Sequence, residues 1–340
     1  MKTTETPWAI AEQDFPLNAT LAEQLEFALG YAVLAPSSHN TQPWLFAIRG
    51  DHIDLYADRT RSLKVCDPTD RELVISCGAA LFHLRLALRH FNLFDHVDLL
   101  PDQGDPDHLA RIWVGTAGAH SPEETLMFHA IPKRRTNRQR FQNDPLPPRL
   151  LAELHTAIFH EGAWLHYVEG EEQRLALAEL IAQADRQQWA DKRFRLELAA
   201  WVHSNHSAAR DGIPGYAQDV DDILSYMGPL VVRTFDLGDG QAAKNAEVAR
   251  HSPALAIIGT SEDTPRDWLL AGQALAHVLL RARVEDVWAS FLNQPIEVPE
   301  LRGKLVQLLD RCGSPQLILR LGFGSEVKPT PRRHVDEVLI

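Results

Sequence analysis

The sequence contains few cysteines, and none of them has the spacing used to bind zinc or to exchange disulfides. Cys66, Cys77 and Cys312 are the only three in 340 residues, and no C-x-x-C pair occurs. An odd number without such a pair argues against a disulfide framework and indicates a reducing compartment. Residues 1–10 lack the apolar core of a signal peptide, and no run approaches 18 consecutive apolar residues. We therefore expect a soluble, cytoplasmic protein.

The motifs of several enzyme classes are missing as well. No G-x-G-x-x-G follows an expected strand and no P-loop occurs, so Rossmann and nucleoside-triphosphatase sites have no support. No G-x-S-x-G turn is present to carry a catalytic serine. His203 and His206 lie three residues apart, but neither an H-E-x-x-H pattern nor a third ligand accompanies them. We expect no metal site.

Positive charge is scarce relative to negative charge. The chain has 34 basic and 46 acidic residues, a formal net charge of −12, which makes nucleic acid a poor partner. Basic residues cluster once, at 133–140, a segment of the right size for one small anion. The length suits two domains of ~150 residues each, and the hydrophobic content of 45% is enough for a sizeable core.

Helical and strand periodicities alternate along the chain. Thr20 and Glu23 form the pattern of a capping box before a helix that ends at Pro36. A second helix, at 70–90, has its apolar residues on one seam, and a second capping box starts at Ser121. Strands are expected at 45–49, 53–55, 97–100, 111–114, 164–168, 254–259 and 317–321, with further helices at 150–159, 171–201, 268–283 and 299–310.

Residues 35–44, between the first helix and the first strand, form the most informative run. They read Ala-Pro-Ser-Ser-His-Asn-Thr-Gln-Pro-Trp. Two prolines bracket hydroxyl and amide side chains, whose donors and acceptors suit the polar edge of a heterocycle. Loops that follow a helix commonly carry binding residues. Each of these residues taken alone equally fits an ordinary turn.

This run is similar to the flavin-binding loop of the nitroreductase family, A-P-S-x-x-N-x-Q-P-W, and we identify the chain with that family's longer, tandem Acg-like branch. The resemblance implies an α+β, nitroreductase-like fold and a bound FMN. It also implies which side chains of the loop lie at the flavin and its ribityl chain: Pro36, Ser37, Ser38, Asn40 and Gln42.

The sequence also repeats itself. Residues 78–89 and 272–283 are identical at six of twelve aligned positions. Trp44 and Trp164 each begin an expected strand, and Gly115 and Gly322 each follow one, so the matches keep the same order. We predict two fused copies of one α+β unit, at 1–120 and 121–340.

The two copies differ where a site would be. Only residues 160–163 precede Trp164, so the second copy lacks the polar loop, and only the second copy is preceded by the basic segment 134–138. Nitroreductases are usually homodimers with FMN between the subunits, one giving the polar loop and the other an R-x-S-x-K/R segment. Arg134, Thr136 and Arg138 are similar to that segment. The resemblance therefore implies an intramolecular pseudo-dimer with one flavin site.

The resemblance assigns roles around that flavin. Arg134 and Thr136 would hold the phosphate, because guanidinium suits a dianion, and Arg138 would place a positive charge near flavin N1. The tail residues Lys328, Arg332 and Arg333 would close over the phosphate, and Leu292 and Asn293 would lie near N5. Each basic run taken alone equally fits a solvated surface.

Three functions stay open at this point. The first is an NAD(P)H-dependent, ping-pong oxidoreductase in which flavin N5, and no catalytic side chain, passes hydride to a nitro compound or quinone. The second is a flavin-sequestering protein, because residues 203–241, rich in Gly and Pro, are similar to a lid over the flavin. The third is an interaction module that keeps the fold without a flavin.

Overall fold

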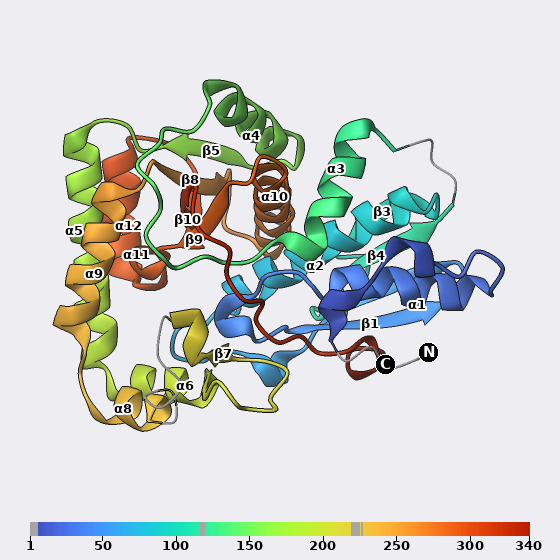
Figure 1. Ribbon diagram of the computed structural model, residues 1–340, viewed down its shortest axis with the longest axis horizontal. Helices are drawn as coiled ribbons and strands as arrows, with labels where there is room; N and C mark the ends of the chain where they lie inside the picture. The colour runs from blue at the N-terminus through green and yellow to red at the C-terminus, as the bar shows by residue number, and fades with distance from the viewer. Residues whose placement is uncertain (1–5, 116–119, 219–224, 226) are drawn as a thin grey trace.

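The computed structural model describes residues 6–115, 120–218, 225 and 227–340 (Figure 1). It contains two four-stranded antiparallel sheets, one in each half of the chain. The first half is built from α1 (Leu21–Ala32), β1 (Trp44–Arg49), β2 (His52–Ala57), α2 (Arg71–His90), β3 (Phe94–Leu99) and β4 (His108–Val114), with short turns η1 (Pro7–Ala9), η2 (Glu12–Asp14), η3 (Ser38–Asn40) and η4 (Arg59–Arg61).

The segment between the two sheets contains α3 (Pro122–Ala130) and η5 (Ile131–Lys133). The sheet and inner helices of the second half are α4 (Pro148–His160), β5 (Trp164–Tyr167), β8 (Ala254–Thr260), α10 (Pro265–Val284), β9 (Trp288–Phe291) and β10 (Ser314–Gly322). Around them lie α5 (Glu171–Ala190), α6 (Lys192–Trp201), β6 (Val202–His203), β7 (Ile213–Pro214), η6 (Gly215–Gln218), α8 (Gly228–Thr234), α9 (Gly238–His251), α11 (Gln294–Glu297), α12 (Pro299–Leu309) and η7 (Val335–Glu337).

The two sheets have the same connectivity. The strand order is β1-β2-β4-β3 in the first and β5-β8-β10-β9 in the second, which in chain order is first-second-fourth-third both times. In each half one helix precedes the first strand, and a 20-residue helix, α2 or α10, connects the second strand to the third. Between β5 and β8 the second half carries the additional segment from α5 to α9.

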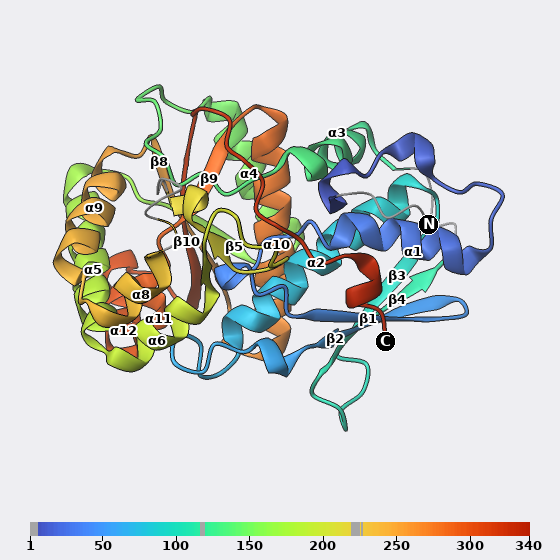
Figure 2. The same cartoon turned by 60° about the horizontal axis from the view of Figure 1, so that its bottom comes forward.

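Helices α2 and α10 pack against each other between the sheets (Figure 2). The seam predicted for α2 is buried throughout, from Val74 through Cys77, Leu81 and Leu84 to Leu88. By length and mean hydropathy α2 is the one helix in the described ranges that is apolar enough to cross a membrane, but 83% of that window is buried inside the fold. Burial on nearly all sides is expected for a core helix that is apolar all round.

Most predicted elements are present, and both capping boxes form. Thr20 Oγ1 accepts from the backbone N–H of Glu23, and Ser121 Oγ accepts from that of Glu124. The single helix predicted at 171–201 is wrong, because Asp191 adopts an extended conformation and caps α6 as a new helix. The predicted loop at 203–241 contains α8 and the start of α9.

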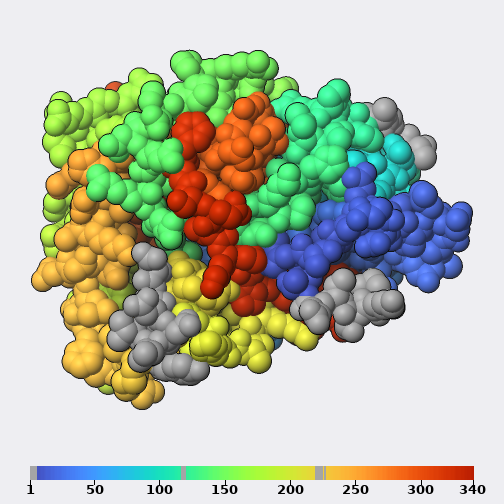
Figure 3. Space-filling model, viewed as in Figure 1, coloured from blue at the N-terminus to red at the C-terminus, as the bar shows by residue number. Residues whose placement is uncertain are grey.

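The C-terminal tail crosses from the second half to the first. After β10 it lies on the surface between the segment that follows α3 and the segment 203–218 (Figure 3). Its end pairs with β1, where the N–H of Phe46 donates to Val338 and the N–H of Ile340 donates to Phe46. The tail thereby joins the two halves beside the polar loop 35–44.

Candidate functional site

A cleft of two connected lobes lies where the polar loop, the basic segment, the tail and α9 meet. The basic lobe has a volume of about 240 Å³ and the acidic lobe about 270 Å³. Pro36, Ser37, Thr136 and Arg138 line both lobes, so the lobes adjoin along the predicted site. Asn40, Arg134, Lys328 and Arg332 line the basic lobe, and Ser38, Leu292 and Asn293 line the acidic lobe.

The polar loop has a conformation that its own side chains hold. The backbone of the loop is left-handed at His39, Asn40 and Gln42, with φ between 51° and 57°. Asparagine tolerates this region better than most residues. Ser37 Oγ accepts from the N–H of Gln42 at 2.9 Å, and the Ser38 hydroxyl donates to Glu72 at 2.5 Å. These contacts fix the loop against the first turn of α2.

The side chain of Asn40 joins three separate parts of the chain. Its amide donates to the backbone oxygens of Gly212 at 3.0 Å and Pro331 at 3.1 Å, and its oxygen accepts from Arg332 at 2.7 Å. The N–H of Gly212 donates back to the Asn40 carbonyl at 3.3 Å. Asn40 therefore ties the segment 203–218 and the tail to the polar loop at the edge of the basic lobe.

Gln42 and Arg333 line neither lobe. The Gln42 amide donates to the Arg210 carbonyl at 2.8 Å, and its oxygen accepts from the N–H of Arg333 at 2.7 Å. The Arg333 guanidinium donates to the Gln42 carbonyl at 3.1 Å. Both side chains were predicted at the cofactor; in the structure they connect the polar loop to the tail.

The basic segment enters the cleft beside β9. Thr136 forms a parallel bridge with Ala289, and the N–H of Asn137 donates to the Ala289 carbonyl at 3.0 Å. Arg134 is buried and reaches back to the Leu34 carbonyl at 3.3 Å, while Arg138 lies where the two lobes join.

The basic lobe is lined by basic side chains that have no carboxylate partner among the residues described. Among the described lining residues a single acid, Glu247, faces eight basic side chains, and within the described ranges Arg134, Arg138 and Arg332 form no ion pair. The basic residues are Arg134, Arg135, Arg138, Arg140, Lys244, Arg320, Lys328 and Arg332. Buried cations ordinarily have a paired charge, and an anion in this lobe would supply one.

Desolvation acts strongly on these guanidiniums. Burial, and then the neighbouring Arg135, lower the pKa of Arg134 to about 9. Burial lowers the pKa of Arg138 as well, and burial followed by Arg134 and Arg135 lowers that of Arg332. The buried Nε atoms of Arg134 and Arg332 have no hydrogen-bond partner in the described part of the chain. A bound anion would satisfy both the charge and these donors.

The acidic lobe combines carboxyls, amides and aromatic rings. Glu297 accepts from the Gln188 amide at 2.6 Å and from the Cys66 thiol at 3.3 Å. Burial, and then the nearby Glu72, raise the pKa of Glu297 to about 8, and burial raises that of Asp185 to about 6. Trp189 and Phe194 form part of the wall. An aromatic molecule would find both flat contacts and hydrogen-bond partners here.

Sequence relatives identify the family of this chain. No family model matches the sequence. The protein Rv3131 of Mycobacterium tuberculosis (strain ATCC 25618 / H37Rv), named as an NAD(P)H nitroreductase, is 30% identical over 324 residues, which cover 94% of this chain and 91% of that protein. This chain belongs to the nitroreductase family. The acg protein of the same strain, also named as an NAD(P)H nitroreductase, is 26% identical over 331 residues and covers 95% of this chain and 97% of its own length.

Solved structures of the family overlap with this nitroreductase-family protein only in part. The FMN-dependent nitroreductase NfnB of Mycobacterium smegmatis, in complex with NADPH, is 16% identical and covers 63% of this chain and 96% of its own, with a TM-score of 0.41. A Bacteroides fragilis nitroreductase with bound FMN is 17% identical and covers 59% and 89%, with a TM-score of 0.37. The predicted family and its α+β fold are confirmed, and the family rests on the sequence relatives.

Several residues that line the cleft of this nitroreductase-family protein belong to none of the motifs from which the site was predicted. Arg320 lies in the cleft from an otherwise apolar strand, and a lone buried charge in such a strand was the available signal. Lys244 and Asn245 come from α9, most of which lies between the predicted loop 203–241 and the strand predicted at 254–259, where no element was predicted. Glu72 and Glu297 are far apart in sequence, and only the packing of the two halves brings them together.

The histidine pair of the additional segment lies away from the cleft. The His203 ring is 3.5 Å from a carboxylate oxygen of Asp211, which is also ion-paired with Arg61. Neither His203 nor His206 lines the basic or the acidic lobe. His203 therefore belongs to the contacts that hold the segment 203–218 against the first half.

Proposed function

We propose that this protein binds one FMN in the cleft and uses it to pass hydride from NAD(P)H to a small aromatic acceptor, a nitro compound or a quinone, in a ping-pong sequence. One observation carries the proposal. The polar loop of the first half lines one continuous cleft with arginines of the second half, which form no ion pair with the residues described. The names of the relatives, NAD(P)H nitroreductases, support the reaction class.

The residues present fit the two ends of FMN. A phosphate dianion in the basic lobe would meet Arg134, Arg332 and Lys328, with the hydroxyl of Thr136 as a further donor. The flat ring would extend past Arg138 into the acidic lobe, beside Leu292 and Asn293. Bound FMN would supply the transfer of hydride between nicotinamide and acceptor. The positive charge of Arg138 would favour the reduced, anionic form of the ring system.

The proposal includes an intramolecular pseudo-dimer. Two sheets with the same strand order, one in 1–120 and one in 121–340, support two fused copies of a unit. Gly78 and Gly272, equivalent in the repeat, also face each other across α2 and α10. A reciprocal contact of this kind is expected near a two-fold axis. The second copy has no counterpart of the polar loop, which leaves one composite site.

A flavin-sequestering function is the second candidate, and the contacts of the segment 203–218 favour it. Asn40 and Gln42 bind backbone atoms of Gly212 and Arg210, and Asp211 is ion-paired with Arg61. Gly212, Ile213 and Tyr216 also line the basic lobe. A lid held by these contacts would cover FMN and slow the approach of nicotinamide.

Anaerobic mixing of the FMN-loaded protein with NADPH or NADH separates the two functions. Rapid loss of flavin absorbance supports the oxidoreductase, whereas a yellow colour that persists for minutes supports sequestration. Asp211→Asn, which removes the ion pair with Arg61, should accelerate the loss of colour only if the segment acts as a lid. A protein that takes up no FMN would contradict both functions and leave the interaction module.

A further inference from the structure

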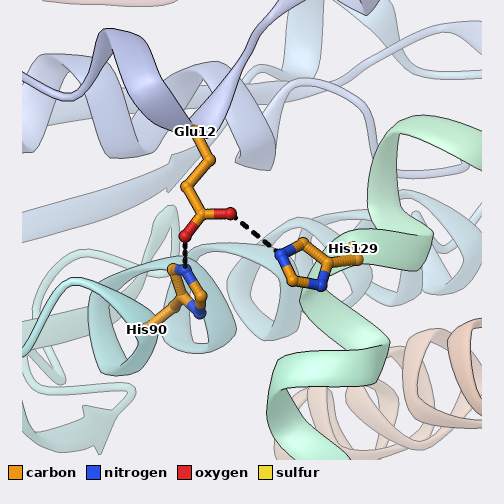
Figure 4. Close-up of side chains that lie close together, drawn as sticks. All are labelled: Glu12, His90 and His129. Atoms are coloured by element: carbon orange, nitrogen blue, oxygen red, sulfur yellow. Dashed lines mark hydrogen bonds and ion pairs between the residues drawn. The ribbon is translucent and has the colours of Figure 1, made fainter.

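Outside the cleft, three side chains from separate segments meet on the first half. Glu12 lies in η2, His90 is the last residue of α2, and His129 is in the last turn of α3. Figure 4 shows the Glu12 carboxylate between the two imidazoles, 2.7 Å from His90 Nε2 and 2.9 Å from His129 Nε2. All three ligand-type atoms lie within 4.8 Å of one another, and none of these residues lines the cleft.

The imidazole of His90 is fixed in place before any ligand arrives. Its side chain is only 9% exposed. It stacks on Phe128 with ring centroids 3.8 Å apart and an angle of 9° between the planes, and it meets Phe91 edge-on at 5.1 Å. A ligand that binds to a preordered side chain does not have to order it, which favours affinity. Glu12 and His129 are 46% and 49% exposed, which leaves the site open to solvent ions.

Behind the cluster, two buried nitrogens have no hydrogen-bond partner among the residues described. They are Nδ1 of His90 and Nδ1 of His120, on rings whose centroids are 5.1 Å apart. A histidine that binds a metal through Nε2 carries its hydrogen on Nδ1 and ordinarily donates it to a group behind the ring. Among the residues described no group accepts a hydrogen bond from Nδ1 of His90, and the ring beside it is that of His120.

We propose that Glu12, His90 and His129 form a site for one divalent transition-metal cation, with Zn²⁺ the best match. Two imidazole nitrogens and one carboxylate are ligands that Zn²⁺ uses with water in a fourth position, whereas Mg²⁺ and Ca²⁺ prefer oxygen alone. A carboxylate only accepts hydrogen bonds, so both Nε2 atoms carry hydrogens without metal. Binding takes the Nε2 lone pairs, and each hydrogen moves to Nδ1 through exchange with water.

The bound cation would act as a structural clamp. Glu12 belongs to the N-terminal segment, which packs on the end of α2 and on α3, and the cluster is where these three segments meet. Phe15 of the same segment stacks on Phe91 at 4.0 Å. A cation that binds the folded site and not the unfolded chain stabilises the fold by mass action.

Calorimetric titration of the tag-free, full-length protein with ZnCl₂ tests the site. Because Cys312 is exposed and offers a competing thiolate, the titration is made in the Cys312→Ser background. We expect one Zn²⁺ per chain, and a loss of affinity of about tenfold or more in both His129→Gln and Glu12→Gln. His96→Gln is the matched control, since His96 is 56% exposed against 49% for His129 and lies 3.0 Å from Asp95, and it should leave the affinity unchanged.

A second readout separates a site from a surface effect. Zn²⁺ should raise the midpoint of thermal unfolding in the parent and in His96→Gln, and this rise should be lost in His129→Gln and Glu12→Gln, while MgCl₂ should raise it in none. Failure of the parent to bind Zn²⁺ overturns the proposal. So does an affinity in His129→Gln equal to that in His96→Gln.

Discussion

Gly78 and Gly272 face each other where α2 crosses α10, and neither position has room for a side chain. A Cβ on Gly78 would lie 2.4 Å from the Leu269 carbonyl oxygen, and a Cβ on Gly272 would lie 2.0 Å from that of Ile75. Leu269 and Ile75 each precede a facing glycine by three residues, so the contact is reciprocal. The helices approach this closely because both positions lack a side chain. This contact explains the presence of glycine in the middle of two helices, where it lowers helix propensity.

Gly272→Ala should destabilise the protein by about 1–3 kcal/mol, because the added methyl group forces the two backbones apart. Denaturant unfolding measures the change. Gly303→Ala is the matched control: Gly303 lies exposed in α12 with nothing within 4 Å of an added Cβ. There the substitution should stabilise the protein by about 0.5–1 kcal/mol. Equal effects at the two positions would contradict the close helix contact.

Arg138→Ala should weaken FMN binding by about 10- to 100-fold, since a charge-assisted interaction is worth about 1.5–3 kcal/mol. Arg138→Lys keeps the charge and should fall between the parent and the alanine variant. Quenching of flavin fluorescence on titration measures each affinity. Arg149→Ala, at a side chain that is 88% exposed on α4, should bind FMN as the parent does. An unchanged affinity in Arg138→Ala would remove that residue from the flavin site.

Glu297 predicts a dependence of stability on pH. Burial and the neighbouring Glu72 raise its pKa from 4.5 to about 8. Between these pH values the Glu297 carboxyl is protonated in the folded state and ionised in the unfolded state. Its contribution to the free energy of unfolding therefore falls as pH rises from about 4.5 to about 8, by at most about 1.4 kcal/mol per pH unit. Above that range it falls no further.

Glu297→Gln, which resembles the protonated carboxyl, should therefore flatten the decline of stability between pH 5 and pH 8. Denaturant midpoints across this range measure the slope, and Glu262→Gln, at an exposed residue, should leave it unchanged. A slope in Glu297→Gln as steep as that of the parent would show that the carboxyl is not protonated in the folded state.

Local signals in the sequence predicted much of the fold. The capping boxes at Thr20 and Ser121 and the seam of α2 depend on residues within a few positions of each other, and the structure confirms them. The start of α6 at Asp191 had a signal in the sequence, because aspartate is a preferred N-cap residue. In the structure its carboxylate accepts from the backbone N–H of Arg193. Good helix formers on both sides of Asp191 led to the prediction of one continuous helix.

What the sequence could not predict depends on contacts between distant segments. α9 begins with Gly-Asp-Gly, a poor helix former, and its buried alanines find their partners on α5. The strand β9 has only four residues and is held by pairing with β10. The acidic lobe is a product of that packing, because Glu72 and Glu297 come from different halves. The contacts between Gln42 and Arg333 likewise follow from how the tail is laid down.

The stoichiometry of FMN binding tests the single composite flavin site most directly. Flavin-free protein, titrated with FMN and followed by flavin fluorescence, should bind one FMN per chain, and a double variant, Ser37→Ala with Arg134→Ala, should lose that binding while it keeps the parent's fold by circular dichroism. Two FMN per chain would contradict a single site. Equally tight binding by the double variant would contradict a site shared between the two halves.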